Sequence, residues 1–362
     1  MNTAAMEVAS LGNLGAPEGP ANADYAELKA RVKRAGLLEK QPAFYLFIGS
    51  LTLGLLAASF VLASLADAVW LHAANGAFMA VVFTQIGFVG HDAGHLQIFR
   101  SPKKNYLALL GVGLLIGLSP SWWLDKHNNH HANPNDIDLD MDINIPIIAF
   151  TDEQAQAKRG LYRHIVKYQS ILFFPMLLVE ALSIRADSAQ FIMRGRNVKH
   201  PIAESLAVIL HFVLYFTLAF TLMSPMHALA FILVHQGLIG VYMGSVFAPN
   251  HKGMPVLSSA FKLDYLRRQV LTSRNVNGSP LIDYMYGGLN YQIEHHLFPT
   301  VPRNKLASVR PIVKEFCKER NIPYYETGMV RSYREILGHL GEIGGQLRKT
   351  SRRTETASQV AR

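Results

Sequence analysis

Seven of the fifteen histidines in the sequence lie in three short clusters, HDAGH, HNNHH and QIEHH. They are His91, His95, His127, His130, His131, His295 and His296. An imidazole nitrogen is a good ligand for iron, zinc or copper, and several imidazoles are needed to hold one ion. The single cysteine, Cys317, cannot build a thiolate site, so any metal bound by this chain would be held by nitrogen and oxygen ligands.

The spacing within the clusters indicates how the imidazoles point. His91 and His95 are four residues apart, and His127 is three and four residues from the next two histidines, so each cluster presents its imidazoles on one side of a helical turn. The first pair taken alone would more often be a structural pair than a ligand set. Two adjacent histidines in a regular helix cannot both point at the same ion. The HH pairs in the second and third clusters therefore favour two metal ions over one.

A further histidine, His251 in APNHKGMP, follows directly on an apolar segment and is predicted to lie at the same membrane depth as the clusters. We interpret it as an eighth ligand, and the alternative is an interfacial histidine that hydrogen-bonds lipid headgroups. Other histidines lie in or at the ends of apolar segments without clustered partners. We expect these to serve in helix packing: His72, His211, His227 and His235.

The composition indicates a membrane protein. Half of the residues are hydrophobic, 17% are charged, and the mean hydropathy is +0.15. From residue 41 to residue 90 the only charged residue is Asp67, and residues 205–250 contain no Asp, Glu, Lys or Arg. Each run is long enough for two crossings of a hydrocarbon core about 30 Å thick. We predict an all-α membrane protein with four transmembrane helices in two hairpins, at about 43–66, 69–90, 203–224 and 226–249.

Another apolar segment, residues 105–124, is also long enough to cross. If it crossed, HNNHH would lie on the opposite side of the membrane from HDAGH, and the two clusters could not share a metal site. We therefore predict a re-entrant or interfacial segment, in which Gly111, Gly113, Gly117 and Pro120 allow the backbone to bend. The alternative is that the segment spans the membrane and the clusters are unrelated.

The distribution of charge predicts the orientation. The net charge is +9, and neither short turn, at Asp67 or at Ser224, carries Lys or Arg, whereas the long connecting segments do. By the positive-inside rule, both termini and all the histidine clusters face the cytoplasm, where they form a histidine-rich helical cap. Basic residues next to apolar spans more often face anionic lipid, so we expect a lipid bilayer and no nucleic acid as a partner.

The two ends of the chain are predicted to be disordered. Residues 1–24 are rich in Ala, Gly, Asn and Pro, and they lack the charged start and compact apolar run of a signal peptide. Residues 343–362 form a basic, polar tail. The membrane domain would then occupy residues 25–342.

The segments HDAGH, WWLDKHNNHH and NYQIEHHLFP together resemble the three histidine boxes of the membrane fatty acid desaturases, over about residues 43–315. The QxxHH form of the third box, with Gln292, is similar to the front-end desaturases, to bacterial proteins labelled linoleoyl-CoA desaturase and to actinobacterial acyl-CoA desaturases. Many eukaryotic front-end members carry a fused cytochrome b5 with an HPGG motif, which this sequence lacks. The resemblance implies a separate electron donor, of the ferredoxin, cytochrome b5 or flavin-reductase type, and a location in a bacterial plasma membrane.

The resemblance further implies a non-haem centre of two iron ions that uses O2 to remove hydrogen from two adjacent methylenes. The product would be a cis double bond in a long-chain acyl-CoA or an acyl lipid. The metal ligands and catalytic residues that it implies are His91, His95, His127, His130, His131, His295 and His296, with His251 as a further metal ligand.

Supporting roles fall to residues beside these boxes. Gln292 and Asn250 would orient a ligand or a bound water, and the alternative for Gln292 is that it touches the metal. Trp122 and Trp123 could line the acyl path, although Trp is common at membrane interfaces without any further role. The flanking carboxylates could hydrogen-bond the far nitrogen of ligating imidazoles and fix their tautomers, and the alternative is that they are only solvated. These carboxylates are Asp92, Asp125 and Glu294.

Other functions remain as alternatives. A fatty acyl or lipid hydroxylase or ketolase of the same superfamily would use related histidine boxes. A divalent-metal transporter is a remote alternative, because transporters place their ligands near the bilayer midplane, whereas these histidines lie at the ends of spans and in loops. The sequence leaves open the position of the double bond (front-end or Δ9), the chain length, the acyl carrier, the electron donor and the oligomeric state.

Overall fold

The computed structural model describes residues 22–258 and 261–360, with side chains as far as Lys349. The predicted disorder of residues 1–21 lies outside these residues. The described residues are mainly helical, with loops and turns between the helices, and their one sheet pairs β1 (Asn275–Val276) in parallel with β2 (Glu326–Thr327).

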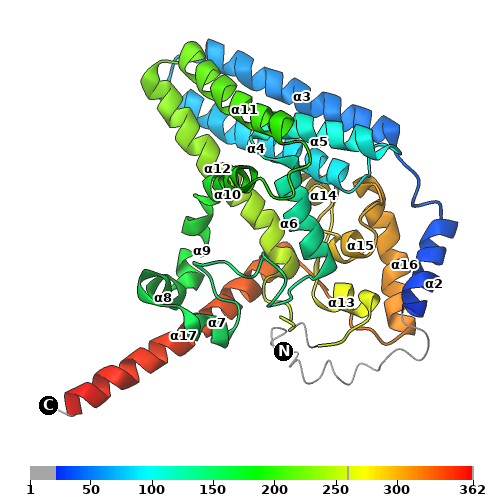
Figure 1. The fold of residues 1–362 in the computed structure, drawn as a ribbon, viewed down its shortest axis with the longest axis vertical. Coiled ribbons are helices and arrows are strands. Elements are labelled where there is room, and N and C mark those ends of the chain that lie inside the picture. Colours follow the sequence, from blue (N-terminus) through cyan, green and yellow to red (C-terminus); the bar gives the residue numbers. More distant parts are fainter. Residues whose placement is uncertain (1–21, 259–260, 361–362) are drawn as a thin grey trace.

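Four long apolar helices form the upper part of the molecule (Figure 1). They are α3 (Pro42–Leu65), α4 (Val69–Gly94), α11 (Pro201–Leu222) and α12 (Pro225–His251), and each is long and apolar enough to cross a membrane. Three of them begin with proline, whose fixed φ suits the first helical turn. The predicted spans are confirmed as helices, but α4 and α12 continue to the histidines that the prediction placed just beyond them.

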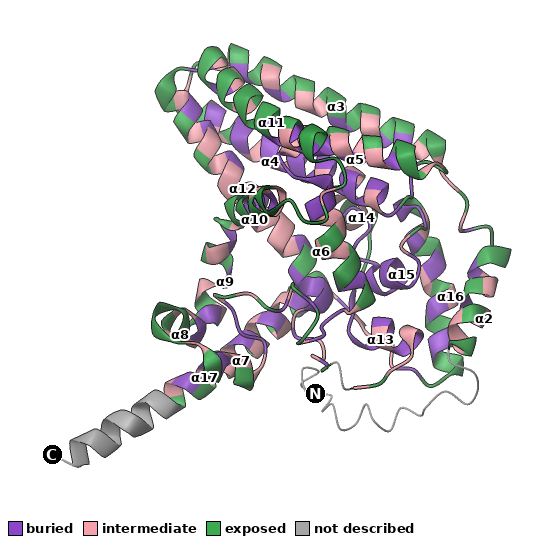
Figure 2. Cartoon of the chain, in the orientation of Figure 1, coloured by how far each residue is buried: buried purple, intermediate pink, exposed green. Residues whose placement is uncertain are grey.

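The four helices differ in what surrounds them. α4 packs against α3, α5 and α12, and most of it is buried. α3 and α11 expose apolar side chains along their outer faces, with Ile202 77% exposed and Leu46 73% exposed (Figure 2). In water such faces would be unfavourable, so the two helices have the surface expected of lipid-facing elements.

The apolar segment before the second histidine cluster folds into two helices, α5 (Pro102–Ile116) and α6 (Pro120–Ala132), which meet at an angle of 110°. Gly117 has a φ of +76°, and the Ser119 hydroxyl caps α6 at the amide of Trp122. By length and composition, this pair is either a broken span or a re-entrant segment. A second bent pair, α9 (Gln169–Leu177) and α10 (Glu180–Arg194), meets at 70°, so four to six crossings are compatible with the fold.

One carboxylate holds the α5–α6 bend against α11. Glu204 is fully buried and accepts hydrogen bonds from the hydroxyls of Tyr106, Ser119 and Ser121, and from the Ser121 amide. A buried carboxylate with this many donors is well satisfied, and it fixes the start of α6 relative to the start of α11.

A helical layer covers the ends of the long helices. It contains α13 (Tyr265–Leu271), α14 (Pro280–Met285), α15 (Gln292–Leu297), the short 3-10 helix η2 (Arg303–Lys305) and α16 (Leu306–Glu319). Helix α2 (Ala23–Arg34) packs on α16 through Leu28 and Val32, so residues 23 and 24 belong to this helix.

The C-terminal segment differs from the predicted disordered tail. Helix α17 (Met329–Val360) includes residues 343–360, and it packs against α7 (Asp152–Ala157), α8 (Gly160–Lys167) and α9. Leu340 and Leu347 are buried, and the Arg348 guanidinium donates to the Lys167 carbonyl. Apolar residues recur every three to four positions at Ile336, Leu340, Ile343 and Leu347, and this helical pattern was missed because the segment is polar on average.

Candidate metal centre

Four segments that are distant in the sequence bring the eight histidines together. The last turn of α4 carries His91, and His95 caps it. Helix α6 carries the second cluster, α12 ends at His251, and α15 carries the third cluster (Figure 1). The predicted convergence of the three clusters and His251 is therefore present in the fold.

Five imidazoles form a first group, joined through their Nε2 atoms. The Nε2–Nε2 distances are 3.2 Å for His91 and His295, 2.8 Å for His95 and His127, 3.1 Å for His127 and His131, and 3.1 Å for His131 and His295. Two nitrogens bound at right angles to a common ion, each at about 2.1 Å, would lie about 3 Å apart. Four of these imidazoles, those of His91, His95, His127 and His295, have ligand nitrogens that all lie within 4.8 Å of one another, which suits one metal ion, and His131 adjoins them.

Three imidazoles form a second group. His251 Nε2 lies 3.3 Å from His130 Nε2 and 3.1 Å from His296 Nε2. The Gln292 amide is 2.9 Å from His251 Nε2, and the Asn250 amide donates to Gln292 Oε1 at 3.0 Å. Gln292 and Asn250 therefore lie beside this group.

The adjacent histidines divide between the groups. His130 belongs to the second group and His131 to the first, and His296 and His295 divide in the same way. This division follows from the helical rotation between neighbouring residues, as the sequence indicated. The His131 and His296 rings stack at 4.2 Å, so the two groups are neighbours.

The residues fit bound metal ions. Burial, and then the neighbouring histidines, lowers the pKa of His295 and of His296 well below the usual 6.5. Both imidazoles are therefore neutral at physiological pH, and each keeps a nitrogen lone pair available. A metal ion shared by several converging nitrogens satisfies these lone pairs, whereas a neutral imidazole has only one N–H to donate.

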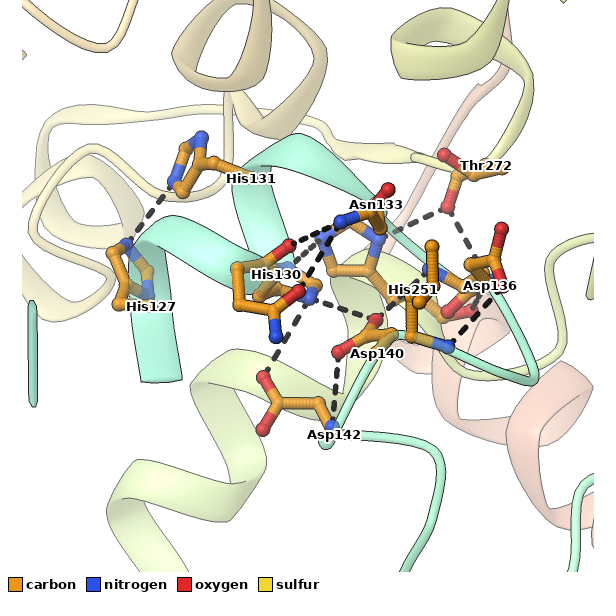
Figure 3. Close-up of polar contacts among 12 residues, drawn as sticks. His127, His130, His131, Asn133, Asp136, Asp140, Asp142, His251 and Thr272 are labelled. Atoms are coloured by element: carbon orange, nitrogen blue, oxygen red, sulfur yellow. Dashed lines mark hydrogen bonds and ion pairs between the residues drawn. The ribbon is translucent and has the colours of Figure 1, made fainter. Parts of the chain in front are cut away.

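Every imidazole of the second group has an oxygen partner at its far nitrogen. His130 Nδ1 lies 2.9 Å from Asp140, His251 Nδ1 lies 3.0 Å from the Thr272 carbonyl, and His296 Nδ1 lies 2.8 Å from Gln269 Oε1. Figure 3 shows Asp140 next to His130 and Thr272 next to His251. Each partner holds the proton at Nδ1 and leaves Nε2 free to bind metal.

The sequence reasoning missed these partners. Asp140 lies in the loop after α6, within the alternating acidic segment DIDLDMD, and that alternation is the signal that could have found it. Gln269 on α13 also donates to the His131 carbonyl at 3.0 Å. Gln269 and Thr272 lie far from the boxes in sequence, so no local pattern marks them.

The predicted carboxylate partners are mostly different residues. Asp92 is the one that lies near a ligand, with Oδ1 3.4 Å from His91 Nδ1, and it forms an ion pair with Arg303 at 3.0 Å. Glu294 points away from the histidines and accepts from Asn275 and Tyr324. Asp125 is exposed. A residue adjacent to a ligand on a helix points roughly 100° away from it, so sequence proximity was misleading.

The two tryptophans have different surroundings. The Trp123 ring stacks on His127 at 4.4 Å, and it lines a small cavity together with His91. Trp122 is buried, and Lys126 lies over its ring. Trp123 is therefore adjacent to the imidazoles and lines the cavity beside His91, whereas Trp122 does not line that cavity.

The remaining apolar-segment histidines lie outside both groups. His72 stacks on His227, and His211 bonds to the Leu114 carbonyl. His235 contacts the Tyr215 hydroxyl at 2.7 Å. Their predicted role in helix packing is confirmed.

Comparison with known proteins agrees with this arrangement. The family model described as fatty acid desaturase matches residues 68–328, which include all eight histidines. A Delta(6)-fatty-acid desaturase of Caenorhabditis elegans is 31% identical over 83% of this chain and 70% of its own length. A Delta(5) fatty acid desaturase of the same organism is 30% identical over 87% of this chain and 74% of its own length. An acyl-lipid (9-3)-desaturase of Physcomitrium patens is 29% identical over 88% of this chain, which spans 62% of that relative. The chain belongs to the fatty acid desaturase family.

Proposed function

We propose that this protein is an O2-dependent desaturase that introduces a cis double bond into a long-chain acyl-CoA or acyl lipid. The observation that carries the proposal is the pair of buried imidazole groups at the ends of apolar helices, in a chain of this family. Buried neutral nitrogens suit a metal, and the adjacent apolar helices suit a hydrocarbon substrate.

We assign one iron ion to each imidazole group. The first would be held by His91, His95, His127, His131 and His295, and the second by His130, His251 and His296, with Gln292 and Asn250 beside it. The irons and O2 would supply the oxidising power that an unactivated methylene requires, which no side chain can supply. Two hydrogens leave the substrate, an external donor adds two electrons, and with two further protons O2 is reduced to two waters.

The chain's own residues hold and shield this centre. Asp140, Gln269 and the Thr272 carbonyl keep the protons of the second group at Nδ1. Burial of the imidazoles excludes water, which would otherwise compete for the ligand positions. The apolar cavity beside His91 is the place where the reacting methylenes would lie.

We place the centre and both termini on the cytoplasmic side, because the basic residues occur in the long segments and not in the short turns. A separate ferredoxin, cytochrome b5 or flavin-reductase type protein would then deliver electrons from that side. The names of the relatives, with Delta(6) and Delta(5) activities, favour a double bond near the carboxyl end.

Expression in a bacterial host with a supplied electron donor tests the proposal. The wild type would produce a new unsaturated acid, which His296→Ala would not form, and mass spectrometry after derivatisation would locate its double bond. His72→Ala, which removes a histidine outside both groups, is the matched control and would keep activity. A hydroxylated product would show that the protein is instead a hydroxylase of the same superfamily. No product, with a donor shown to support another desaturase, would reject the proposal.

A further inference from the structure

The last two turns of α12, which ends at His251, contain a proline that weakens the helix. Pro249 has no N–H, so it cannot donate to the Ser245 carbonyl one turn earlier. The last four carbonyls of any helix also lack a partner within that helix. His251 is the ligand that α12 contributes to the second group, so its position depends on the groups that support these carbonyls.

Arg274 supports this end of α12 with three donors. Its Nε donates to the Pro249 carbonyl at 2.5 Å, its Nη2 to the Lys252 carbonyl at 2.7 Å, and its backbone N–H to the Asn250 carbonyl at 2.9 Å. These acceptors lie on both sides of His251 in the chain. The Arg274 side chain is 1% exposed, so its positive charge is buried against a helix end that carries partial negative charge.

The other terminal carbonyls of α12 have donors as well. The Lys252 amide bonds to the Ala248 carbonyl, and the Asn135 side chain donates to the His251 carbonyl at 3.1 Å. Arg274 differs from these donors because one residue joins carbonyls before and after His251. Loss of its guanidinium would therefore release the backbone on both sides of this ligand.

Helix α17 holds Arg274 in turn. It passes beside the end of α12 (Figure 1), and Glu335 accepts from Arg274 Nη1 at 2.8 Å. The Tyr333 hydroxyl, two residues earlier on α17, donates to the Ser245 carbonyl, which Pro249 leaves without a helical donor. Both contacts of α17 thus support the same end of α12.

We propose that Arg274 is a positioning residue that orients His251 toward the second iron, and that α17 maintains this arrangement through Glu335 and Tyr333. This inference rests on the proposed function and adds positioning residues to it. The second group has three imidazoles, so a displaced His251 would leave two, fewer than a bound ion usually has. The first group contains no residue of α12 or α17, so its iron should not respond.

Titration of the purified, iron-loaded proteins with a competing chelator tests this inference. In Arg274→Gln, the affinity for one iron is expected to fall about 10- to 100-fold, while the affinity for the other iron stays unchanged. Arg274→Lys keeps the charge but lacks the planar fork that joins two carbonyls, so its affinity should lie between those of the wild type and Arg274→Gln. Arg310→Gln, which breaks the ion pair with Glu326 between α16 and β2, is the matched control and should keep both irons.

A double-mutant cycle tests the contribution of α17. Glu335→Gln should weaken the same iron by a smaller factor than Arg274→Gln does. Because Glu335 is proposed to act through Arg274, this effect should vanish when Arg274→Gln is already present. An equal effect of Glu335→Gln in both backgrounds would overturn the proposed link through Arg274.

Two further measurements separate positioning from general stability. Thermal unfolding of the metal-free proteins in detergent verifies that each variant folds. The kcat should fall with the content of the second iron, whereas the KM for the acyl substrate should stay near the wild-type value. The reason is that the cavity beside His91 contains neither Arg274 nor His251. If Arg274→Gln does not fold, Glu335→Gln and Tyr333→Phe decide the inference, since both keep Arg274.

The outcomes for the two proposals can be distinguished. Unchanged affinity for both irons in the folded variants, or equal weakening of the two irons, would overturn this inference and leave the desaturase proposal standing. A wild type that binds two irons yet forms no unsaturated acid with a competent donor would reject the proposed function. The chelator titration would then still decide the role of Arg274.

Discussion

The two imidazole groups are held in place in different ways. In the second group, each imidazole is fixed at Nδ1 by an oxygen from Asp140, Thr272 or Gln269. In the first group, the buried Nδ1 atoms of His131 and His295 have no hydrogen-bond partner. The first group instead has more imidazoles and close ring contacts, including Trp123 stacked on His127. The second group is thus oriented by hydrogen bonds to its imidazoles. The first group is instead held by a larger number of imidazoles and by the packing of their rings.

Removing one ligand from each group gives the largest expected effect. His251→Ala leaves two imidazoles in the second group, so iron should fall from about two to about one per chain, since three or four ligands are usual for a bound ion. His295→Ala leaves four imidazoles in the first group and should retain most of its iron. Both variants should lose activity by more than about 10³-fold, because catalysis requires the complete centre.

Metal analysis of the purified proteins, with His72→Ala as control, measures this difference. Equal loss of iron from His251→Ala and His295→Ala would show that the groups do not bind independently. That outcome would remove the distinction between a group held by ligand number and one held by hydrogen bonds.

Changing an oxygen partner should weaken iron binding by the second group only. Asp140→Asn replaces the carboxylate that faces His130 Nδ1, and the affinity of that group for iron should fall about 10- to 100-fold. Titration with a competing chelator would detect one weakened and one unchanged iron. Asp125→Asn makes the same change at the exposed carboxylate on α6 and should behave as the wild type, and a comparable loss there would contradict the assignment of Asp140.

Disturbing the ring packing around the first group should have a smaller effect, which we expect on the free energy of unfolding. A Cβ at Gly94 would lie 2.0 Å from the Trp123 ring, so Gly94→Ala must displace the ring that stacks on His127. Overpacking of this kind costs about 1–3 kcal/mol in the free energy of unfolding. Gly111→Ala is the control, because a Cβ there meets no atom within 4 Å. Equal thermal stability of the two variants would show that the Trp123 contact does not support the group.

Lowering the pH should decrease the free energy of unfolding of the metal-free protein. The decrease should be smallest near neutral pH. The pKa values of His295 and His296 are lowered well below 6.5 in the folded chain, so the unfolded chain takes up protons first as the pH falls. The free energy of unfolding should therefore be constant above about pH 7.5 and fall as the pH drops through 6.5. Thermal unfolding between pH 8 and pH 5.5 measures this, and a rise in stability with acid would contradict neutral imidazoles.

Much of the fold could be predicted from the sequence because its signals are strong and local. Long uncharged runs predicted α3, α4, α11 and α12, and the HH pairs predicted that neighbouring histidines divide between two sites. These conclusions depend on helix length and helical rotation, which are fixed by backbone geometry.

The hydrogen-bond partners could not be predicted in the same way. Glu294 is next to His295 in sequence yet bonds to Asn275 and Tyr324, and the partner of His296 is Gln269 on another helix. Tertiary packing decides such contacts, and a local pattern contains no information on them. Helix α17 was missed for a related reason, because its buried stripe is visible only by periodicity and its average composition is polar.

Glu204 gives the molecule a mechanical linkage. Its carboxylate ties the first turn of α11, which has an exposed apolar face, to the start of α6, which carries three histidines. A bilayer that changed the tilt of α11 would turn α6 with it, so membrane thickness would become a control on the geometry of the centre. The test measures the activity of the wild type and of Glu204→Gln in thin and in thick bilayers. Equal dependence of both proteins on bilayer thickness would exclude this coupling through Glu204.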